Sequence, residues 1–255
     1  MAPVHCVRLL LAEFDRPFTS IRALRSSRNH AGRWLHFLEE SGISVLAVSG
    51  PAEGIILDRA IDSVGHRAHL QPHFRLNDVH TPADHLIGPR GGGKALAEAC
   101  FTGTAPIVGI FAVRLMCAAF DCALNFAKTE KRGGAAPIIS HQAVGYALAD
   151  AKMAIEAVRS LSLRAAHAFD KQVPGALELA LHAKVFGSET AVRVISDLMR
   201  VVGIDSYDRT LPLGDLLADA LLLPLFDGGN MGVRRRQLHE LMQMPDYDPL
   251  AASGD

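Results

Sequence analysis

The sequence predicts a mainly α-helical protein in which a helical bundle follows a smaller, partial β domain. From Lys94 onward, apolar residues recur at the spacing of helices that bury one face. Before them, the segment ISVLAV at residues 43–48 is almost continuously apolar, as a buried strand is. A composition of 49% hydrophobic and 21% charged residues is typical of a packed globular chain rather than of a disordered one.

The elements are expected in a fixed order along the chain. Residues 1–40 are basic and lack periodicity, so we expect an irregular segment, with residues 22–33 the most flexible. Short β segments are predicted at residues 43–48, 54–57 and 73–79. The predicted helices span residues 94–128, 138–169, 174–202, 213–223 and 231–244, with Gly203 ending the third and Pro245 the last. We therefore divide the chain into an irregular segment (1–40), a partial β domain (41–89), a helical bundle (90–247) and a tail (248–255).

Charge and cysteine usage limit the classes of partner. The formal net charge is -1, so no overall field attracts nucleic acid or an anionic membrane. We find no apolar run of the length that crosses a membrane, and the first residues make a poor signal peptide because Arg8 interrupts their apolar patch. The 4 cysteines form no CxxC pair, which favours reduced thiols. We expect an intracellular, cytoplasmic protein without a nucleic-acid partner or a membrane span.

The segment around Asp227 is the strongest local candidate for chemistry. Asp227 follows a mostly apolar run, where poor solvation would raise the pKa of its carboxyl toward the range of a general base. Gly228 and Gly229 would let the backbone approach a flat ligand closely, and Asn230 suits the N-cap of the next helix. Arg234 returns a positive charge toward the same place. On composition alone, a loop carboxylate followed by a solvated basic helix face is the favoured interpretation.

A second candidate combines an arginine with a glycine-rich turn. Arg132 precedes two glycines, and Gln142 follows His141 at the start of the next predicted helix. Such an arginine beside a helix N-terminus can hold phosphate, although most arginines in this setting are solvated.

Two further patterns are weaker. Residues 88–95 match the spacing of a phosphate-binding loop, but Ala95 stands where magnesium binding needs Ser or Thr. Five histidines crowd residues 66–85 without a cysteine or a helical register that would shape a zinc site. We predict neither a nucleoside-triphosphate site nor a metal site here, but a polar loop surface.

Several segments, taken in order, resemble the acyl-CoA dehydrogenase superfamily over roughly residues 43–245. Residues 74–88 resemble its strand and turn leaving the middle β domain, and residues 128–168 resemble its bundle helices. Residues 182–207 resemble the helix that ends in a Gly-Gly-x-Gly-Tyr turn, with some of those glycines replaced here. Asp227 stands where the common acyl-CoA dehydrogenases have a Glu-Gly-Thr motif. Its Asp-Gly-Gly-Asn motif, the three arginines that follow, and residues 96–109 resemble the nitroalkane oxidases within this superfamily.

This resemblance implies a fold, a cofactor and a reaction. The fold would be the superfamily's C-terminal four-helix-bundle domain, in a homodimer or homotetramer, and the cofactor would be FAD. Asp227 would take the α-proton of a neutral nitroalkane, Thr104 would hydrogen-bond that aspartate, and Arg234 would support it. The products would be an aldehyde or ketone, nitrite and hydrogen peroxide. The positions that match FAD-lining residues, some of them reaching a neighbouring subunit's cofactor, are Arg132, Gln142, Arg200, Gly203, Gly228 and Gly229.

The same resemblance implies a missing part and leaves alternatives open. The superfamily carries an N-terminal helical domain and a complete β domain ahead of the segments matched here, so we expect a truncated form whose activity is impaired or absent. One alternative is an acyl-CoA dehydrogenase that acts on an acyl-CoA thioester with aspartate as its base. Another is a non-catalytic helical module that only oligomerises.

Overall fold

The computed structural model describes residues 20–23, 33–39, 42–48, 53–69, 71–77, 79 and 81–251. The chain divides into two compact units, the first formed by Met1–Ser63 and Arg67–Cys100 and the second by Val64–His66 and Phe101–Asp255. Our division at residues 40, 89 and 247 stays a prediction.

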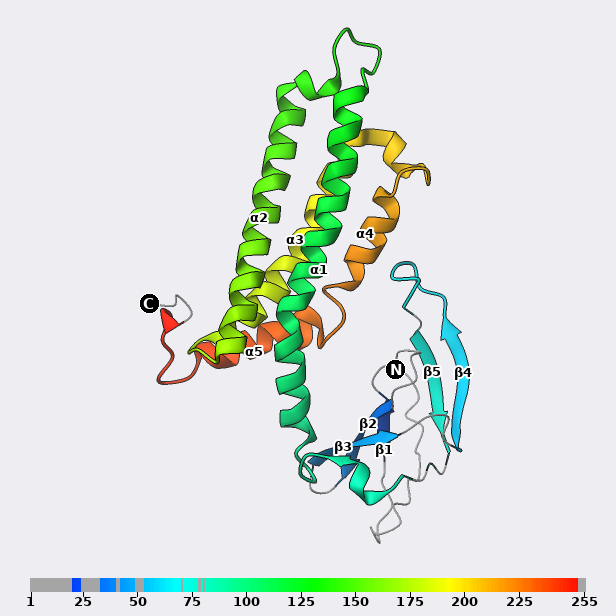
Figure 1. The fold of residues 1–255 in the computed structure, drawn as a ribbon, viewed down its shortest axis with the longest axis vertical. Coiled ribbons are helices and arrows are strands. Elements are labelled where there is room, and N and C mark those ends of the chain that lie inside the picture. Colours follow the sequence, from blue (N-terminus) through cyan, green and yellow to red (C-terminus); the bar gives the residue numbers. More distant parts are fainter. Residues whose placement is uncertain are drawn as a thin grey trace. The chain divides into compact units, whose positions relative to one another are not determined.

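The first unit contains two antiparallel sheets (Figure 1). One has the strand order β1-β2-β3-β6, and the other pairs β4 with β5. Their bounds are β1 Ser20–Ala23, β2 Arg33–Glu39, β3 Gly42–Val48, β4 Ile55–Ile61, β5 Gln71–Leu76 and β6 Leu86–Ile87, with the short helix η1 at Ala83–His85. Val45, Leu46 and Val48 are buried, which confirms the predicted buried strand.

Strands β1 and β2 lie within the segment that we expected to be irregular, and that expectation is wrong for them. β2 pairs with β3 along its whole length, from Arg33 opposite Val48 to Glu39 opposite Gly42. The backbone partner lies outside the segment, so a local pattern does not reveal it. Residues 24–32, most of the stretch expected to be flexible, fall outside the described residues.

The second unit is a bundle of long helices, and the predicted mainly helical fold is confirmed. The helix α1, Gly93–Thr129, begins in the first unit and belongs to the second from Phe101 onward. It lies beside α2 and α3, with α4 along the same bundle and α5 across its lower end (Figure 1). The remaining bounds are η2 Ile138–Ser140, α2 Gln142–Lys171, α3 Ala176–Val202, η3 Gly203–Tyr207, α4 Leu213–Leu222, the π-helical segment η4 Gly229–Arg234, and α5 Arg235–Met242.

Of two predicted helix ends, one is confirmed and the other is wrong. Gly203 ends α3 as predicted, with a φ of 74° that suits glycine. Asn230, expected as an N-cap, lies inside η4 instead, and the cap is Gly228 with no side-chain hydrogen bond. The prediction for Asn230 was wrong because its amide is used by residues of α3, far away in sequence.

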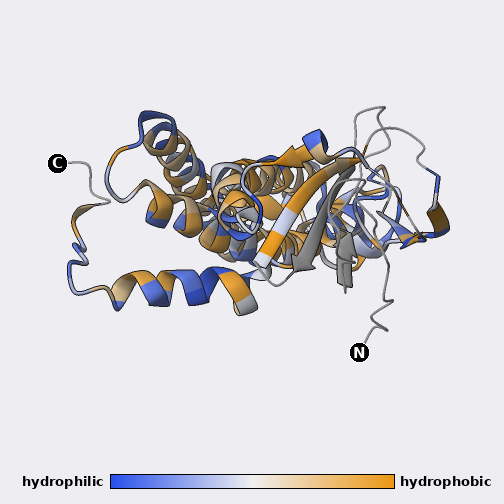
Figure 2. Cartoon of the chain, turned by 90° about the horizontal axis from the view of Figure 1, so that it is seen from below, coloured by the Kyte–Doolittle hydropathy of each residue, from blue (hydrophilic) through white to orange (hydrophobic). Residues whose placement is uncertain are grey.

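Small residues let the helices of the bundle pack closely. The buried face of α1 includes Val108, Ala112, Met116, Ala119 and Ala123. Where α1 and α3 cross, a Cβ on Gly187 would lie only 3.1 Å from the Cα of Gly109. Along the helices, apolar stretches alternate with polar ones (Figure 2). The bundle core is therefore fitted to glycine and alanine at its contact points.

Helix α1 is long and apolar enough to cross a membrane by length and composition, contrary to our expectation that no such run exists. Its composition has a second explanation in the bundle, where Ala112, Met116 and Ala119 are each 0% exposed. A core helix of a packed domain needs the same apolar residues as a membrane span.

We expect Gly109→Ala to destabilise the bundle by about 1–3 kcal/mol, the usual effect of overpacking a tight core. An added Cβ would lie 2.2 Å from the Ser162 hydroxyl oxygen and 3.1 Å from the carbonyl oxygen of Ala183. The matched control is Gly145→Ala in α2, where a Cβ meets nothing within 4 Å and should stabilise the helix by up to about 1 kcal/mol. Urea unfolding of both variants checks this, and equal effects at the two positions would contradict the packing argument.

Candidate active site

The candidate site is built around a strained turn between α4 and η4. Asp227, Gly228 and Gly229 follow one another with φ values of 49°, 90° and 61°, all left-handed. A non-glycine residue in this region costs about 1–2 kcal/mol, so the surrounding contacts must hold Asp227 in place. A Cβ on Gly229 would meet nothing within 4 Å. Asp227 itself is half-buried, and it is followed by glycine backbone that has room for a flat ligand at Gly229.

Arg234 supports this turn from inside the protein. Its side chain is 1% exposed, and its Nε donates a hydrogen bond of 2.8 Å to the carbonyl oxygen of Asp227. Its Nη1 donates to Oε1 of Gln237 at 2.9 Å, and its guanidinium lies 5.9 Å from the centre of the Phe101 ring. The structure therefore brings Asp227 and Arg234 together, with a contact to the main chain that sequence reasoning did not anticipate.

Thr104 lies one helical turn from this contact. Its hydroxyl donates to the carbonyl oxygen of Phe101 at 3.2 Å, and the Phe101 ring faces Arg234. Thr104 thus belongs to the same neighbourhood on α1, and its hydrogen bond to the Asp227 carboxylate stays a prediction.

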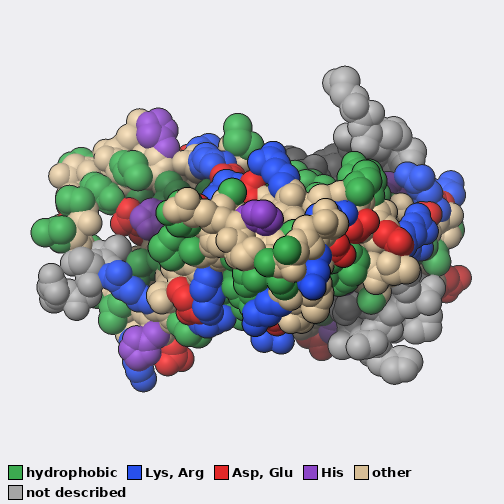
Figure 3. All heavy atoms as spheres, turned by 90° about the horizontal axis from the view of Figure 1, so that it is seen from above, with side chains coloured by type: hydrophobic (Ala, Val, Ile, Leu, Met, Phe, Trp, Pro, Cys, Tyr) green, Lys and Arg blue, Asp and Glu red, His purple; other side chains and the backbone are tan. Residues whose placement is uncertain are grey.

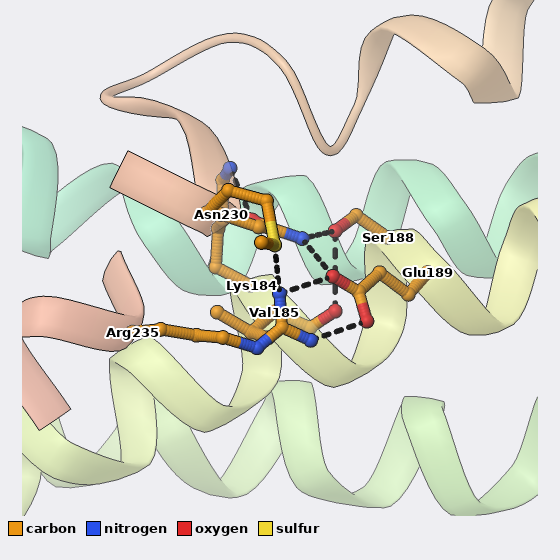
Figure 4. A network of polar contacts seen from close by, with 7 residues as sticks. Lys184, Val185, Ser188, Glu189, Asn230 and Arg235 are labelled. Carbon is orange, nitrogen blue, oxygen red and sulfur yellow. Dashed lines mark hydrogen bonds and ion pairs between the residues drawn. The ribbon is translucent and has the colours of Figure 1, made fainter. Parts of the chain in front are cut away.

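A buried polar network, missed by our sequence reasoning, joins the turn to α3 (Figure 4). Lys184 is 0% exposed, and its Nζ donates to Oδ1 of Asn230 at 2.7 Å. The Nδ2 of Asn230 donates to Oγ of Ser188 at 3.0 Å and to Oε1 of Glu189 at 3.1 Å. The sequence does contain one sign of this network: Lys184 falls on the apolar stripe of α3, where a lysine is unusual.

The outer edge of the network is an ion pair between α3 and α5. Both Nη atoms of Arg235 donate to the carboxylate of Glu189, at 2.6 and 2.7 Å. The hydrogen bond from Arg235 is the main cause that lowers the pKa of Glu189, with further contributions from Asn230 and Lys184. The same pairing raises the pKa of Arg235.

We expect this ion pair to make the free energy of unfolding depend on pH. Because the pKa of Glu189 is lower in the folded protein than its ordinary value of 4.5, the stabilisation is fully present above about pH 4.5 and is lost as the pH falls through the folded pKa. Both side chains are over 40% exposed, so the contribution should stay below about 1 kcal/mol. Unfolding of Glu189→Gln and of the wild type at pH 7 and pH 3 measures it. The two proteins should differ more at pH 7, and a difference independent of pH would contradict the pairing.

The second candidate group caps the C-terminal end of α3. Arg132 donates through Nη2 to the carbonyl of Val202 and pairs with Asp205 at 2.8 Å, while its guanidinium lies 5.3 Å from the centre of the Phe126 ring. A Cβ on Gly203 would lie 3.4 Å from the same Nη2. The structure thus brings Arg132 and Gly203 together.

Gln142 and Arg200 are exposed near this end. Gln142 donates to the hydroxyl of Tyr146, and Arg200 pairs with Asp197 at 3.0 Å. Arg200 also lines an open groove of about 380 Å³ between α2 and α3. The bundle end around the loop between α1 and α2 mixes basic, acidic and apolar side chains (Figure 3).

The two candidate groups are separate. Asn230 contacts Ser188, and Gly203 follows 15 residues later on the same helix, which is about 22 Å at the rise of an α-helix. The loop that carries Arg132 and the turn that carries Asp227 lie toward opposite ends of the bundle (Figure 1). Gly228 and Gly229 belong with Asp227, whereas Arg132, Gln142, Arg200 and Gly203 form the other group.

The weaker sequence patterns have structural roles. The main-chain N–H of His66 donates to Oδ1 of Asp219, and its ring Nε2 lies 2.9 Å from the main-chain carbonyl oxygen of Asp219. The His85 ring lies 3.2 Å from the Thr81 hydroxyl. Among the described residues, no group of three or more His, Cys, Asp or Glu side chains could hold a metal ion, and His80 falls outside them. In the phosphate-loop-like segment, a Cβ on Gly93 would lie 2.6 Å from the carbonyl oxygen of Ile43, so this glycine allows α1 to start against β3.

Comparison with known proteins identifies the class. The sequence profile of "Acyl-CoA dehydrogenase, C-terminal domain" matches residues 91–242, more than half of the chain. The chain therefore belongs to the acyl-CoA dehydrogenase family, and the resemblance inferred from its motifs is confirmed. Its relatives in this family are FAD-dependent flavoproteins.

Among the relatives, nitroalkane oxidase of Podospora anserina is 45% identical over 194 residues, covering 74% of this chain and 45% of that protein. Its solved structure superposes with a TM-score of 0.81 at 40% identity, covering 85% of this chain and 53% of that one. Cyclohexane-1-carbonyl-CoA dehydrogenase of Geobacter metallireducens is 31% identical over 190 residues, covering 74% of this chain and 50% of that protein. The chain thus spans about half the length of the curated relatives it matches.

One further solved structure bears on the site. It comes from an analysis of the roles of an arginine and an aspartate in the reaction of the flavoprotein nitroalkane oxidase, at 33% identity and a TM-score of 0.79, covering 83% of this chain and 51% of that one. The two residues are seven positions apart in that protein, which is the spacing of Asp227 and Arg234 here.

Proposed function

We propose that this chain forms the helical part of an FAD-dependent oxidoreductase of nitroalkane oxidase type, with Asp227 as the base. The observation that carries the proposal is the Asp227 turn, a strained and open backbone held by a buried arginine seven residues later. The matching spacing of an aspartate and an arginine in a nitroalkane oxidase supports it.

In the proposed reaction, the Asp227 carboxylate takes the α-proton of a neutral nitroalkane. Arg234 supports the negative charge that develops on the substrate and keeps the turn in place. FAD, when bound, would supply the two-electron oxidation, with oxygen as the final acceptor. A primary nitroalkane, oxygen and water yield an aldehyde, nitrous acid and hydrogen peroxide, and a secondary nitroalkane yields a ketone.

The residues at the turn fit a flat cofactor. Gly229 leaves open space where any other residue would place a side chain, and Gly228 adds no bulk beside Asp227. Arg132, Gln142, Arg200 and Gly203 belong to the other group, because Gly203, which lies beside Arg132, caps α3 about 22 Å from Ser188. At that distance they do not reach the same place. We therefore propose that this second group serves the FAD of a neighbouring copy in a homodimer or homotetramer. An intracellular, cytoplasmic location remains part of the proposal, supported by the free thiols of Cys117 and Cys122.

The main alternative is an acyl-CoA dehydrogenase, favoured by the relative from Geobacter metallireducens. An aspartate places its carboxylate about one methylene further from the substrate than a glutamate does. A displacement of this size should slow proton abstraction from a thioester positioned for glutamate, because rates fall steeply with misplacement of about 1 Å.

One set of assays separates the possibilities. The purified protein is incubated with FAD, and the flavin absorbance, nitrite release from nitroethane, and dye reduction by butyryl-CoA are measured. We expect bound flavin, and nitrite above the background of the Asp227→Asn protein. Dye reduction by butyryl-CoA without nitrite would favour the acyl-CoA dehydrogenase. If the protein neither binds flavin nor turns over either substrate, the proposal is overturned in favour of a non-catalytic oligomerising module.

A further inference from the structure

Lys184 is a fully buried cation whose presence packing does not explain. It lies on the buried stripe of α3 with Ala180, Ala191 and Ile195, and it is 0% exposed. A buried ammonium is unfavourable unless polar groups meet its charge, and an apolar side chain of similar volume would fill this space without that penalty. The lysine therefore has a role that depends on its charge and its N–H donors.

Lys184 contacts residues that lie on both sides of Asp227 in the sequence. Its Nζ donates to Oδ1 of Asn230 at 2.7 Å, three residues after Asp227. The same Nζ lies 6.0 Å from the centre of the ring of Phe226, the residue directly before Asp227. The side chain of Lys184 extends from α3 to the amide of Asn230 (Figure 4).

Asn230 transmits this contact to the backbone of the turn. Its main-chain N–H donates to the carbonyl of Pro224 at 2.8 Å, which closes the loop around Asp227. Its side chain is 2% exposed and is also held by Ser188 and Glu189. Asp227 has a left-handed φ of 49°, a conformation that persists only where the surroundings determine it fully.

We propose that Lys184 is a positioning residue for Asp227, which holds Asn230 and faces Phe226 and thereby fixes the turn that presents the Asp227 carboxylate. This inference rests on the proposed function, in which Asp227 is the base. The order of the turn can be measured without substrate, so the two proposals can fail separately.

Hydrogen exchange of the full chain, followed by mass spectrometry, tests the structural part. In Lys184→Met, the amides of residues 226–232 should exchange about 10-fold faster, while those of residues 191–202 in the same helix stay unchanged. The matched control is Lys152→Met, which removes the same charge from an exposed lysine that pairs with Glu156 on α2. It should leave exchange at residues 226–232 as in the wild type.

A second variant shows whether Lys184 acts through Asn230. Asn230→Ala should accelerate the same amides, and the double variant should be no faster than the stronger single one, because the two residues form one contact. Should Lys184→Met fail to fold, Asn230→Ala and the charge-conserving Lys184→Arg carry the same comparison, with Lys184→Arg restoring protection in part. Additive effects, or acceleration spread evenly over the bundle, would overturn the positioning role.

Turnover supplies the functional part. In protein that oxidises nitroethane, kcat of Lys184→Met should fall by up to about 10²-fold with KM little changed, because a misplaced base slows proton transfer more than it weakens substrate binding. A wild type without turnover would count against the proposed function alone. Unchanged exchange at residues 226–232 in Lys184→Met would count against the positioning role alone.

Discussion

Asp227→Asn should lower kcat/KM for nitroethane by about 10²–10⁴-fold, the usual contribution of a positioned general base. Asparagine has nearly the same volume as aspartate but accepts no proton. It also tolerates the left-handed conformation, so the φ of 49° at this position should be retained. The fold and flavin binding should therefore stay intact while proton abstraction is lost. Initial rates of nitrite release, together with circular dichroism and the flavin spectrum, measure the two effects separately.

The control for this substitution is Asp170→Asn at the end of α2. Asp170 is 76% exposed, lies 3.7 Å from Lys171, and should have no effect on rate or stability when replaced. Asp227→Glu adds the methylene that separates this site from the common acyl-CoA dehydrogenases. A gain of butyryl-CoA oxidation in Asp227→Glu would show that the position of the carboxylate decides between a nitroalkane and a thioester substrate. Full nitroethane activity in Asp227→Asn would rule out Asp227 as the base.

Arg234→Met should reduce both stability and turnover. The guanidinium is 1% exposed and satisfies the carbonyl oxygen of Asp227 and Oε1 of Gln237. Methionine leaves both acceptors without this donor, which should lower the free energy of unfolding by about 2–4 kcal/mol. Since the same contact holds the Asp227 turn, kcat/KM should fall as well. Urea unfolding and initial-rate kinetics on the same preparations check the two expectations.

Two variants distinguish charge from geometry at this position. Arg234→Lys keeps the positive charge but lacks the planar fork that reaches Asp227, Gln237 and the Phe101 ring together, so it should recover stability only in part. Arg236→Met removes an arginine two residues away that is 62% exposed and pairs with Glu240 at 3.5 Å. It should change stability by less than about 0.5 kcal/mol. If Arg234→Met and Arg236→Met lower the free energy of unfolding equally, the buried contacts of Arg234 are not the cause of the loss.

Much of the bundle could be predicted because its signals are local. The helical spacing from Lys94 onward predicted the long helices to within a few residues, and Gly203 marked the end of α3 correctly. The family was recognisable from motifs in order, and the Asp227 and Arg234 pair stood out through its apolar and glycine-rich surroundings. These features depend on neighbours within one or two helical turns, which a sequence displays directly.

The parts that escaped prediction depend on partners distant in the chain. Strands β1 and β2 exist because β2 pairs with β3, and their own segment carries no clear periodicity. Asn230 looked like a helix cap, but Lys184 binds its amide from 46 residues away. The contact of Arg234 with the main chain of Asp227 requires the left-handed turn, which no residue pattern specifies.

The sequence alone determined the helical class and the family, and it singled out Asp227 and Arg234 as candidates, because periodicity and motif spacing are written along the chain. Only the tertiary structure decided that Asp227 is held in a strained turn by Arg234 and by the buried Lys184–Asn230 contact. It also decided that Gly203, which lies beside Arg132, is about 22 Å along α3 from Ser188, the residue that Asn230 contacts. Such contacts arise when helices pack, and packing joins residues whose separation in sequence says nothing of their distance in space.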